Sequence, residues 1–313
     1  MPQFARYLGI DNSGAKTPTS SLKGLRLYAA GPTQPPAEVP PPPSPRKYWS
    51  RRGLAEWLAA ELRDGPPTLV RIDHGFSFPL RYFEFHQLPT DWPHFLEDFQ
   101  HHWPTDDDHL YVDFIRDGLH GHGAARTGNS RWRRMTEERS RAKSVFHFDV
   151  QGSVAKSTHA GLPWLRYLRQ QLGERLHFWP FDGWTPPPGR SVIAEVYPAL
   201  WSRTYPSEDR NPDQHDAYSV ARWMQQSDAA GTPHTLFTPP ICCLLNAIWH
   251  SWKAGSSASP EFPNACHRTT PNRGQTGSAD GLGERVGNAA RRLPRHRRQP
   301  TLRPRRRTHR HPQ

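Results

Sequence analysis

The sequence predicts an α/β protein in which a mixed sheet of five strands is flanked by helices. Short apolar runs bounded by turn residues alternate with stretches in which apolar residues recur at helical spacing. Two of these runs, at 7–10 and 68–72, each lead into an aspartate that is followed within three residues by a glycine. Proteins of this class bind ligands at the carboxyl ends of their strands, so we expect a site where these two runs end.

The first stretch, residues 7–16 (YLGIDNSGAK), contains a short strand that runs straight into Asp11. The next three residues, 12–14, supply a turn. An acid at a strand end beside such a turn is a common way to hold a ligand. A simpler role, in which the Asp11 side chain only starts the turn, fits this stretch equally well. Residues 22–30 (LKGLRLYAA) predict a second strand, antiparallel to the first in a hairpin.

A proline-rich segment separates the first strand and acid from their second copy. Residues 32–45 contain eight prolines, which favours an extended, polyproline-like connector over the alternative, a ligand for an SH3-type domain. Helical spacing of apolar residues then predicts a helix over 50–64 with Ser50 as its N-cap. Residues 68–74 (TLVRIDH) predict a strand that ends in Asp73, with Gly75 as a breaker.

Residues 76–148 are predicted to be an insertion rather than a part of the sheet. Two helices are expected, around 93–101 and 108–119, followed by a basic, disorder-leaning loop at 131–144. Aromatic and basic residues mixed in this insertion indicate either contact with a polyanion or the more frequent solvated surface of mixed charge. These residues are Trp92, Trp103, Arg131, Trp132, Arg133, Arg134 and Lys143.

Two further strands lie between two further helices. A helix is predicted over 161–173, with Pro163 near its first turn, and a short edge strand over 176–181. Residues 191–197 (SVIAEVY) predict a buried strand that is interrupted only by Glu195. An acid in such a run is costly unless it is paired with a cation or a metal.

The final helix, residues 211–228, starts at an asparagine N-cap followed by proline. Asp216 lies at the amino-terminal end of the apolar stripe that is expected to pack on the sheet. Asp213 projects from nearly the same face, although the helix dipole alone explains an acid in the first turn. An acid on the packed stripe needs a partner, which makes Asp216 the stronger candidate.

The composition of the chain changes at residue 238. Of the net charge of +12, residues 239–313 carry +11, from 14 Lys and Arg against 3 Asp and Glu, so residues 1–238 are nearly neutral. We therefore predict a folded domain over 1–238 and a basic, low-complexity, disordered tail over 239–313. Such a tail fits nonspecific nucleic-acid binding, the absence of a selected partner, or a shifted reading frame.

The cysteines and the apolar runs predict a cellular location. All three cysteines lie in the tail, and no apolar run approaches the length of a membrane span. The chain enters a strand by about residue 6, which leaves no space for a signal peptide. We expect a cytoplasmic protein with no membrane partner.

Four aspartates are expected to converge if the strands at 7–10 and 68–74 are parallel neighbours. Converging carboxylates repel one another, which costs stability and raises some of their pKa values. A divalent cation relieves this repulsion, and ligation by oxygen alone favours Mg²⁺ or Mn²⁺ over zinc. Two such ions can clamp the attacking and leaving oxygens of a phosphodiester. The predicted metal ligands are Asp11, Asp73, Asp213 and Asp216.

Six segments carry a family resemblance: GIDNSGAK, VRIDHGFSFP, GSVAKSTHAGLPWLRYLR, HFWPFDGW, AEVYPALW and DQHDAYSVARWM. Together they resemble a bacterial family of domains of unknown function that are predicted RNase H-like nucleases, similar in plan to Holliday-junction resolvases. The resemblance covers most of residues 5–238. It implies an RNase H-like fold with Asp11 on the first strand, Asp73 on the fourth, and Asp213 with Asp216 on the last helix in the metal-binding places. Glu195 matches the glutamate of the family's E-x-x-P motif.

These residues predict a metal-dependent nuclease that hydrolyses phosphodiester bonds in nucleic acid. A catalytically silent RNase H-like binding or scaffold module is the alternative from a different class, and the near-neutral charge of residues 1–238 favours it. An actin-like phosphotransferase is the third reading, because GIDNSG resembles a first phosphate loop, but no second glycine-rich loop follows. The predicted catalytic residues are Asp11, Asp73, Glu195, Asp213 and Asp216, with Lys16 to neutralise the scissile phosphate.

Overall fold

The computed structural model describes residues 2–43, 46–231 and 237. A mixed six-stranded sheet in the order β3-β2-β1-β4-β6-β5 lies at the centre of these residues. The predicted tail over 239–313, with all three cysteines, lies outside the described residues. The strands are β1 (Arg6–Asp11), β2 (Arg26–Ala30), β3 (Ala37–Glu38), β4 (Thr68–Asp73), β5 (Leu176–Trp179) and β6 (Ser191–Glu195).

The sheet combines an antiparallel part with a parallel part. The β1–β2 hairpin is antiparallel, as predicted, and β4 runs parallel to β1 on its other side. The sheet has one strand more than the five expected, because β3 pairs with β2 inside the proline-rich segment. This strand consists of only Ala37 and Glu38. The flanking prolines cannot donate hydrogen bonds to a neighbouring strand, so the sequence pattern does not predict a strand here.

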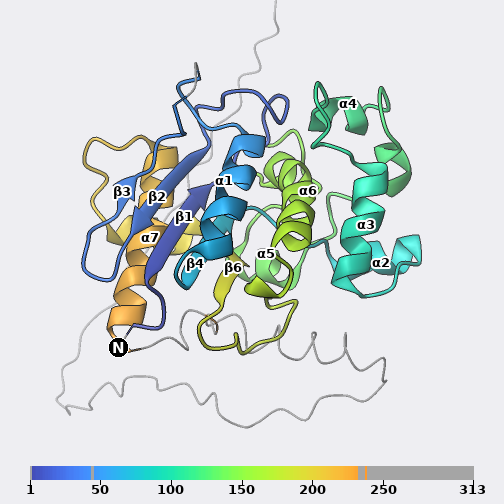
Figure 1. The fold of residues 1–313 in the computed structure, drawn as a ribbon. Helices are drawn as coiled ribbons and strands as arrows, with labels where there is room; N and C mark the ends of the chain where they lie inside the picture. Colours follow the sequence, from blue (N-terminus) through green and yellow to red (C-terminus); the bar gives the residue numbers. More distant parts are fainter. Residues whose placement is uncertain (1, 44–45, 232–236, 238–313) are drawn as a thin grey trace, which may run out of the picture. The chain divides into compact units, whose positions relative to one another are not determined.

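Helices cover the two faces of the sheet (Figure 1). α7 (Pro212–Ala229) packs on β1 and β2, and α1 (Arg51–Asp64) packs against α6 (Ala155–Leu172) over the other face. Side-chain alternation separates the faces, because Leu8 and Ile10 of β1 contribute to the apolar cluster with α1 and α6, whereas Tyr7 contributes to the cluster with α7. The helices are α1 (Arg51–Asp64), α2 (Leu80–His86), α3 (Trp92–His102), α4 (Val112–Arg116), α5 (Met135–Ser140), α6 (Ala155–Leu172) and α7 (Pro212–Ala229). Short 3-10 turns span Gly123–Arg126, Gly173–Arg175, Pro198–Leu200 and Ser202–Thr204.

Two predicted N-caps are confirmed. Ser50 Oγ accepts a hydrogen bond from the Gly53 N–H at 3.1 Å and starts α1. Asn211 Oδ1 accepts from the Gln214 N–H at 3.0 Å, and Gln214 Oε1 accepts in return from the Asn211 N–H at 3.1 Å. This reciprocal capping box fixes the first turn of α7, the turn that carries Asp213.

Pro163 lies inside α6 rather than near its first turn, because the helix begins at Ala155, six residues before the predicted start. Proline lacks the N–H that would otherwise bond to the carbonyl of His159, four residues earlier. Thr105 Oγ1 donates to that carbonyl instead, at 2.6 Å. This hydrogen bond from the insertion satisfies the carbonyl that the proline leaves unpaired within the helix.

Thr105→Val is expected to lower the free energy of unfolding by about 1–3 kcal/mol, because the buried carbonyl of His159 loses its donor while the shape of the side chain is kept. Thr105 is fully buried. Urea unfolding measures the difference. Thr204→Val is the matched control, because Thr204 donates to the Trp201 carbonyl at 2.7 Å in an exposed position; we expect a change below about 0.5 kcal/mol. Equal losses in the two variants would contradict the explanation.

The insertion contains an aromatic core. Phe78, Tyr82, Phe95, Phe99 and Phe146 contact one another with ring centroids 4.7 to 6.4 Å apart. The helix predicted at 93–101 is α3, whereas the region 108–119 contains only the five-residue α4. The sequence did not predict α2, which lacks a side-chain N-cap and therefore lacks the usual start signal.

The segment 131–144, predicted to be a disorder-leaning loop, contains α5 and a buried ion pair. Arg134 is 9 % exposed and Glu137 is fully buried. The two residues are three apart at the start of α5, a spacing at which their side chains form an ion pair. The segment therefore contains a helix and is not a loop throughout. Trp92, Trp103 and Arg134 are buried, so neither alternative, contact with a polyanion or a solvated surface, is right for these three residues. Arg131, Trp132, Arg133 and Lys143 remain exposed or half-exposed.

Candidate functional site

Asp11 and Asp73 lie side by side at the carboxyl ends of two central strands of the sheet. They are the last residues of β1 and β4, two adjacent parallel strands, and they are direct partners in the register. Because alternate residues of a strand share a face, Asp11 lies on the face of Tyr7, and Asp73 on the face of Leu69. Tyr7 and Leu69 both belong to the apolar cluster with α7. The two aspartates are therefore on the face of the sheet that α7 covers.

The close approach of α7 to β1 depends on Gly9. A Cβ atom at this position would lie 2.2 Å from the Ala217 carbonyl oxygen and 2.8 Å from the Ala221 nitrogen. A glycine inside a strand often marks such a contact with another backbone. The first turn of α7 is also tied to β3, because Gln214 Nε2 donates to Glu38 Oε2 at 2.7 Å. These contacts hold the amino-terminal end of α7, with its acids, near the ends of the central strands.

The charges of four aspartates act on one another. Burial is the main cause that raises the pKa of Asp11 well above its usual range, and the neighbouring carboxylates of Asp73, Asp213 and Asp216 raise it further. Burial likewise raises the pKa of Asp73 to about 8, with contributions from Asp216 and then Glu195. Burial raises the pKa of Asp216 as well, and Asp213 adds to this, while a hydrogen bond from Ser202 lowers it.

The arginine that lowers the pKa of Asp11 forms an ion pair with an acid outside the group of four aspartates. Arg26, the register partner of Asp11 on β2, lowers the pKa of Asp11. Its guanidinium is paired with Glu38 at 2.8 Å. Arg26 thus forms its ion pair with Glu38 rather than with Asp11. Burial and the neighbouring carboxylates therefore oppose ionisation of Asp11 and Asp73, and Arg26 offsets this only in part for Asp11.

The four aspartates do not form a ready-made metal site. In the part of the chain that the structure describes, no group of three or more His, Cys, Asp or Glu side chains is close enough together to hold a metal ion. The acids nevertheless provide only oxygen donors, and their repulsion adds to the larger effect of burial in raising the pKa of Asp11. This donor set suits a hard divalent cation, which would relieve the repulsion by drawing the carboxylates together.

Lys16 lies in the loop after Asp11 with its side chain exposed. This loop is fixed by Arg51, whose guanidinium donates to the carbonyls of Ser13, Ala15 and Lys16 at 2.7 to 2.9 Å. Arg51 is 3 % exposed, and its pKa is lowered to about 10 by burial. Sequence reasoning missed Arg51, because an arginine in the first turn of a helix usually points into solvent. It positions the loop that follows the first acid.

Glu195, also predicted to be a site residue, is placed differently from the aspartates. Its register partner on β4 is Ile72, and alternation along β6 puts it on the face of Ile193, which α1 and α6 cover. Its Oε2 forms an ion pair with Arg134 at 2.7 Å. The partner that a buried acid in this strand requires is therefore an arginine from the insertion. The sequence analysis names Arg134 among the basic residues of the insertion but does not predict this ion pair.

Comparison of the chain with protein-family models, with curated proteins and with solved structures found no match. None of the helices in the described residues is both long enough and apolar enough to cross a membrane.

Proposed function

We propose that the protein is an RNase H-like nuclease that hydrolyses phosphodiester bonds in nucleic acid with Mg²⁺ or Mn²⁺. The observation that carries the proposal is the direct register pairing of Asp11 with Asp73 at the ends of two parallel strands, on the face covered by α7. Asp213, in the first turn of α7, and Asp216, three residues later, act electrostatically on Asp11. First strand, fourth strand and a late helix are also where the family resemblance expects the metal ligands.

Each residue has a specific role in this proposal. Asp11 and Asp73 would hold the metal, and Asp213 and Asp216 on α7 would supply further oxygen ligands. When bound, the divalent ion would supply an activated water and neutralise charge on the phosphate. Lys16, exposed in the loop after Asp11, neutralises the scissile phosphate. Arg51 keeps that loop in place through its three carbonyl contacts.

The test is cleavage by the purified full-length chain. Branched DNA, single-stranded DNA and an RNA–DNA hybrid are incubated with the protein in Mg²⁺ or Mn²⁺. We expect cleavage of at least one of these substrates, loss of activity in EDTA, and a fall of more than about 100-fold in Asp11→Asn. Asp64→Asn is the control, because this acid is 85 % exposed at the end of α1. Equal activity in the wild type and Asp11→Asn would remove the proposal.

A second candidate, a catalytically silent binding or scaffold module, is favoured by one observation. Residues 1–238 carry a net charge of only +1, since 11 of the 12 net positive charges lie beyond them, and nonspecific nucleic-acid affinity rests mainly on basic residues. This module would show no thermal shift with divalent ions. It would also still bind its partner after the four aspartates are replaced by asparagine.

A further inference from the structure

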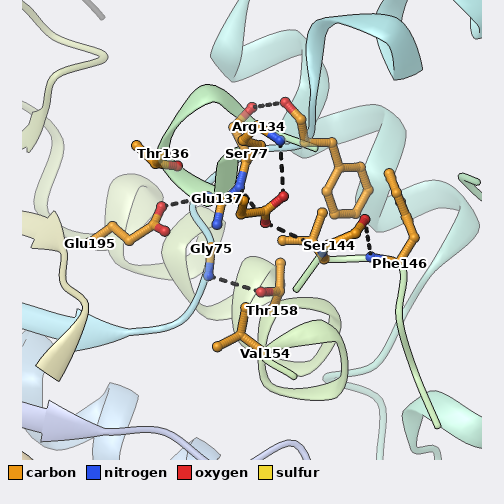
Figure 2. A network of polar contacts seen from close by, with 12 residues as sticks. Gly75, Ser77, Arg134, Thr136, Glu137, Ser144, Phe146, Val154, Thr158 and Glu195 are labelled. Atoms are coloured by element: carbon orange, nitrogen blue, oxygen red, sulfur yellow. Dashed lines mark hydrogen bonds and ion pairs between the residues drawn. The ribbon is translucent and has the colours of Figure 1, made fainter. Parts of the chain in front are cut away.

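Arg134 forms the centre of a buried polar network in the insertion (Figure 2). Its Nε donates to Glu137 Oε1 at 2.9 Å, and its backbone N–H donates to Glu137 Oε2 at 2.9 Å. Glu137 also accepts from the Val145 N–H at 3.2 Å. Contacts within the insertion therefore fix the orientation of the guanidinium.

The other two nitrogens of this guanidinium reach the segment at the end of β6. Nη1 donates to Glu195 Oε2 at 2.7 Å, and Nη2 donates to the Tyr197 hydroxyl at 2.7 Å. The same Glu195 oxygen accepts from the Phe76 N–H at 3.0 Å. Phe76 lies three residues after Asp73. One carboxylate oxygen thus joins the insertion, the end of β6 and the turn that leaves β4.

The turn after Asp73 is held at a second point that does not involve Glu195. The Gly75 N–H donates to Thr158 Oγ1 on α6 at 2.9 Å. A Cβ atom on Gly75 would lie 3.0 Å from both Arg134 Nη1 and Thr158 Oγ1. The backbone therefore passes so close to these two side chains that its path is fixed immediately beyond Asp73.

Glu195 is also on the wrong side of the sheet to join the other acids. It shares with Ile72 and Ile193 the face that α1 and α6 cover, whereas Asp73, the next residue after Ile72, lies on the face of α7. Asp213 and Asp216 are carried by α7. A ligand shell that contained all of these carboxylates would have to include groups from both faces of the sheet.

We infer that Glu195 is a positioning residue and not a metal ligand: Arg134 orients its carboxylate, which holds the Phe76 N–H and so fixes the direction in which Asp73 is presented. This inference rests on the proposed function, because it assigns Glu195 a role in the same site. It makes the insertion a support of the acid cluster, since residue 134 belongs to the insertion and residues 73 and 195 to the sheet.

The test compares Glu195→Gln with Asp73→Asn, two isosteric changes that each remove one charge. The Mn²⁺ dissociation constant is measured by electron paramagnetic resonance without substrate, and kcat is measured on the substrate that the wild type cleaves. For Asp73→Asn we expect the dissociation constant to rise more than about 100-fold. For Glu195→Gln we expect a smaller rise, of about tenfold, because Asp73 is still present but less well oriented, while kcat falls about 10- to 100-fold.

A second variant, Tyr197→Phe, guards against a folding defect in Glu195→Gln. It removes the hydroxyl that accepts from Arg134 Nη2 and leaves every carboxylate in place. We expect an unchanged Mn²⁺ dissociation constant and a lower kcat. A dissociation constant in Glu195→Gln as high as in Asp73→Asn, or an unchanged kcat in both Glu195→Gln and Tyr197→Phe, would overturn the inference.

The outcomes also separate this inference from the proposed function. If the wild type binds Mn²⁺ but cleaves no substrate, the nuclease proposal fails, and the dissociation constants alone still decide whether Glu195 is a ligand. If the wild type binds no Mn²⁺, both the proposed function and this inference are overturned.

Discussion

Replacing Arg134 with methionine is expected to lower the free energy of unfolding by about 3–5 kcal/mol, because it leaves buried carboxylates without their cation. Arg134 pairs with Glu137, whose side chain is 0 % exposed, and with Glu195, whose side chain is 21 % exposed. Methionine fills much of the volume of arginine but donates to neither acid. The loss is measured by urea unfolding at neutral pH.

Two further variants test the cause of this loss. Arg133→Met changes the exposed neighbour of Arg134, and we expect a change within about 0.5 kcal/mol. The double variant Arg134→Met, Glu137→Met should recover part of the stability, because it removes the more deeply buried of the two uncompensated charges. A loss below about 1 kcal/mol in Arg134→Met would show that the network of Figure 2 contributes little to the fold.

The second large effect concerns pH. In metal-free buffer, the free energy of unfolding is expected to fall as the pH rises from about 4 to about 8, since Asp73 has a usual pKa of 3.8 and a folded-state pKa raised to about 8. The folded state therefore binds this proton more tightly than the unfolded chain. The stabilisation from this proton is complete below the pKa of Asp73 in the unfolded chain. It is lost as the pH rises through the pKa of Asp73 in the folded protein. The slope is up to about 1.4 kcal/mol per pH unit for each such group.

Urea unfolding over this pH range, in wild type and Asp73→Asn, measures the effect. We expect a flatter profile in Asp73→Asn, although the raised pKa values of Asp11 and Asp216 keep part of the slope. At pH 8, Mn²⁺ should raise the melting temperature of the wild type and leave that of Asp73→Asn unchanged, because an ion that binds only the folded state stabilises it. Asp64→Asn, at an exposed acid, should behave as wild type. Identical profiles in all three proteins would contradict the raised pKa of Asp73.

The α/β class and most elements of the fold could be predicted from the sequence, because their signals are local. Ser50 and Asn211 are confirmed as N-caps, and the run that ends in Asp73 is confirmed as a strand. The two-residue β3 was missed among prolines, and α2 was missed because Pro79 provides no side-chain cap. In both cases the element is stabilised by contacts with distant residues rather than by its own sequence.

The placement of the candidate site residues was only partly predictable. Asp11 and Asp73 end adjacent strands, a position that local patterns indicate. Glu195 also ends a strand, but its face depends on the register that pairs it with Ile72, which no local pattern reveals. Arg134 was assigned to a loop because a run of basic residues usually indicates a solvated surface. Only the fold shows that it pairs with acids at residues 137 and 195.

The most direct test of the metal proposal is a crystal structure of the full-length chain grown or soaked in Mn²⁺, with data collected for anomalous scattering. We predict an anomalous peak within about 2.0–2.3 Å of carboxylate oxygens of both Asp11 and Asp73, with Asp213 or Asp216 drawn toward it and Glu195 still paired with Arg134. A well-ordered structure without a peak between Asp11 and Asp73 would contradict the account.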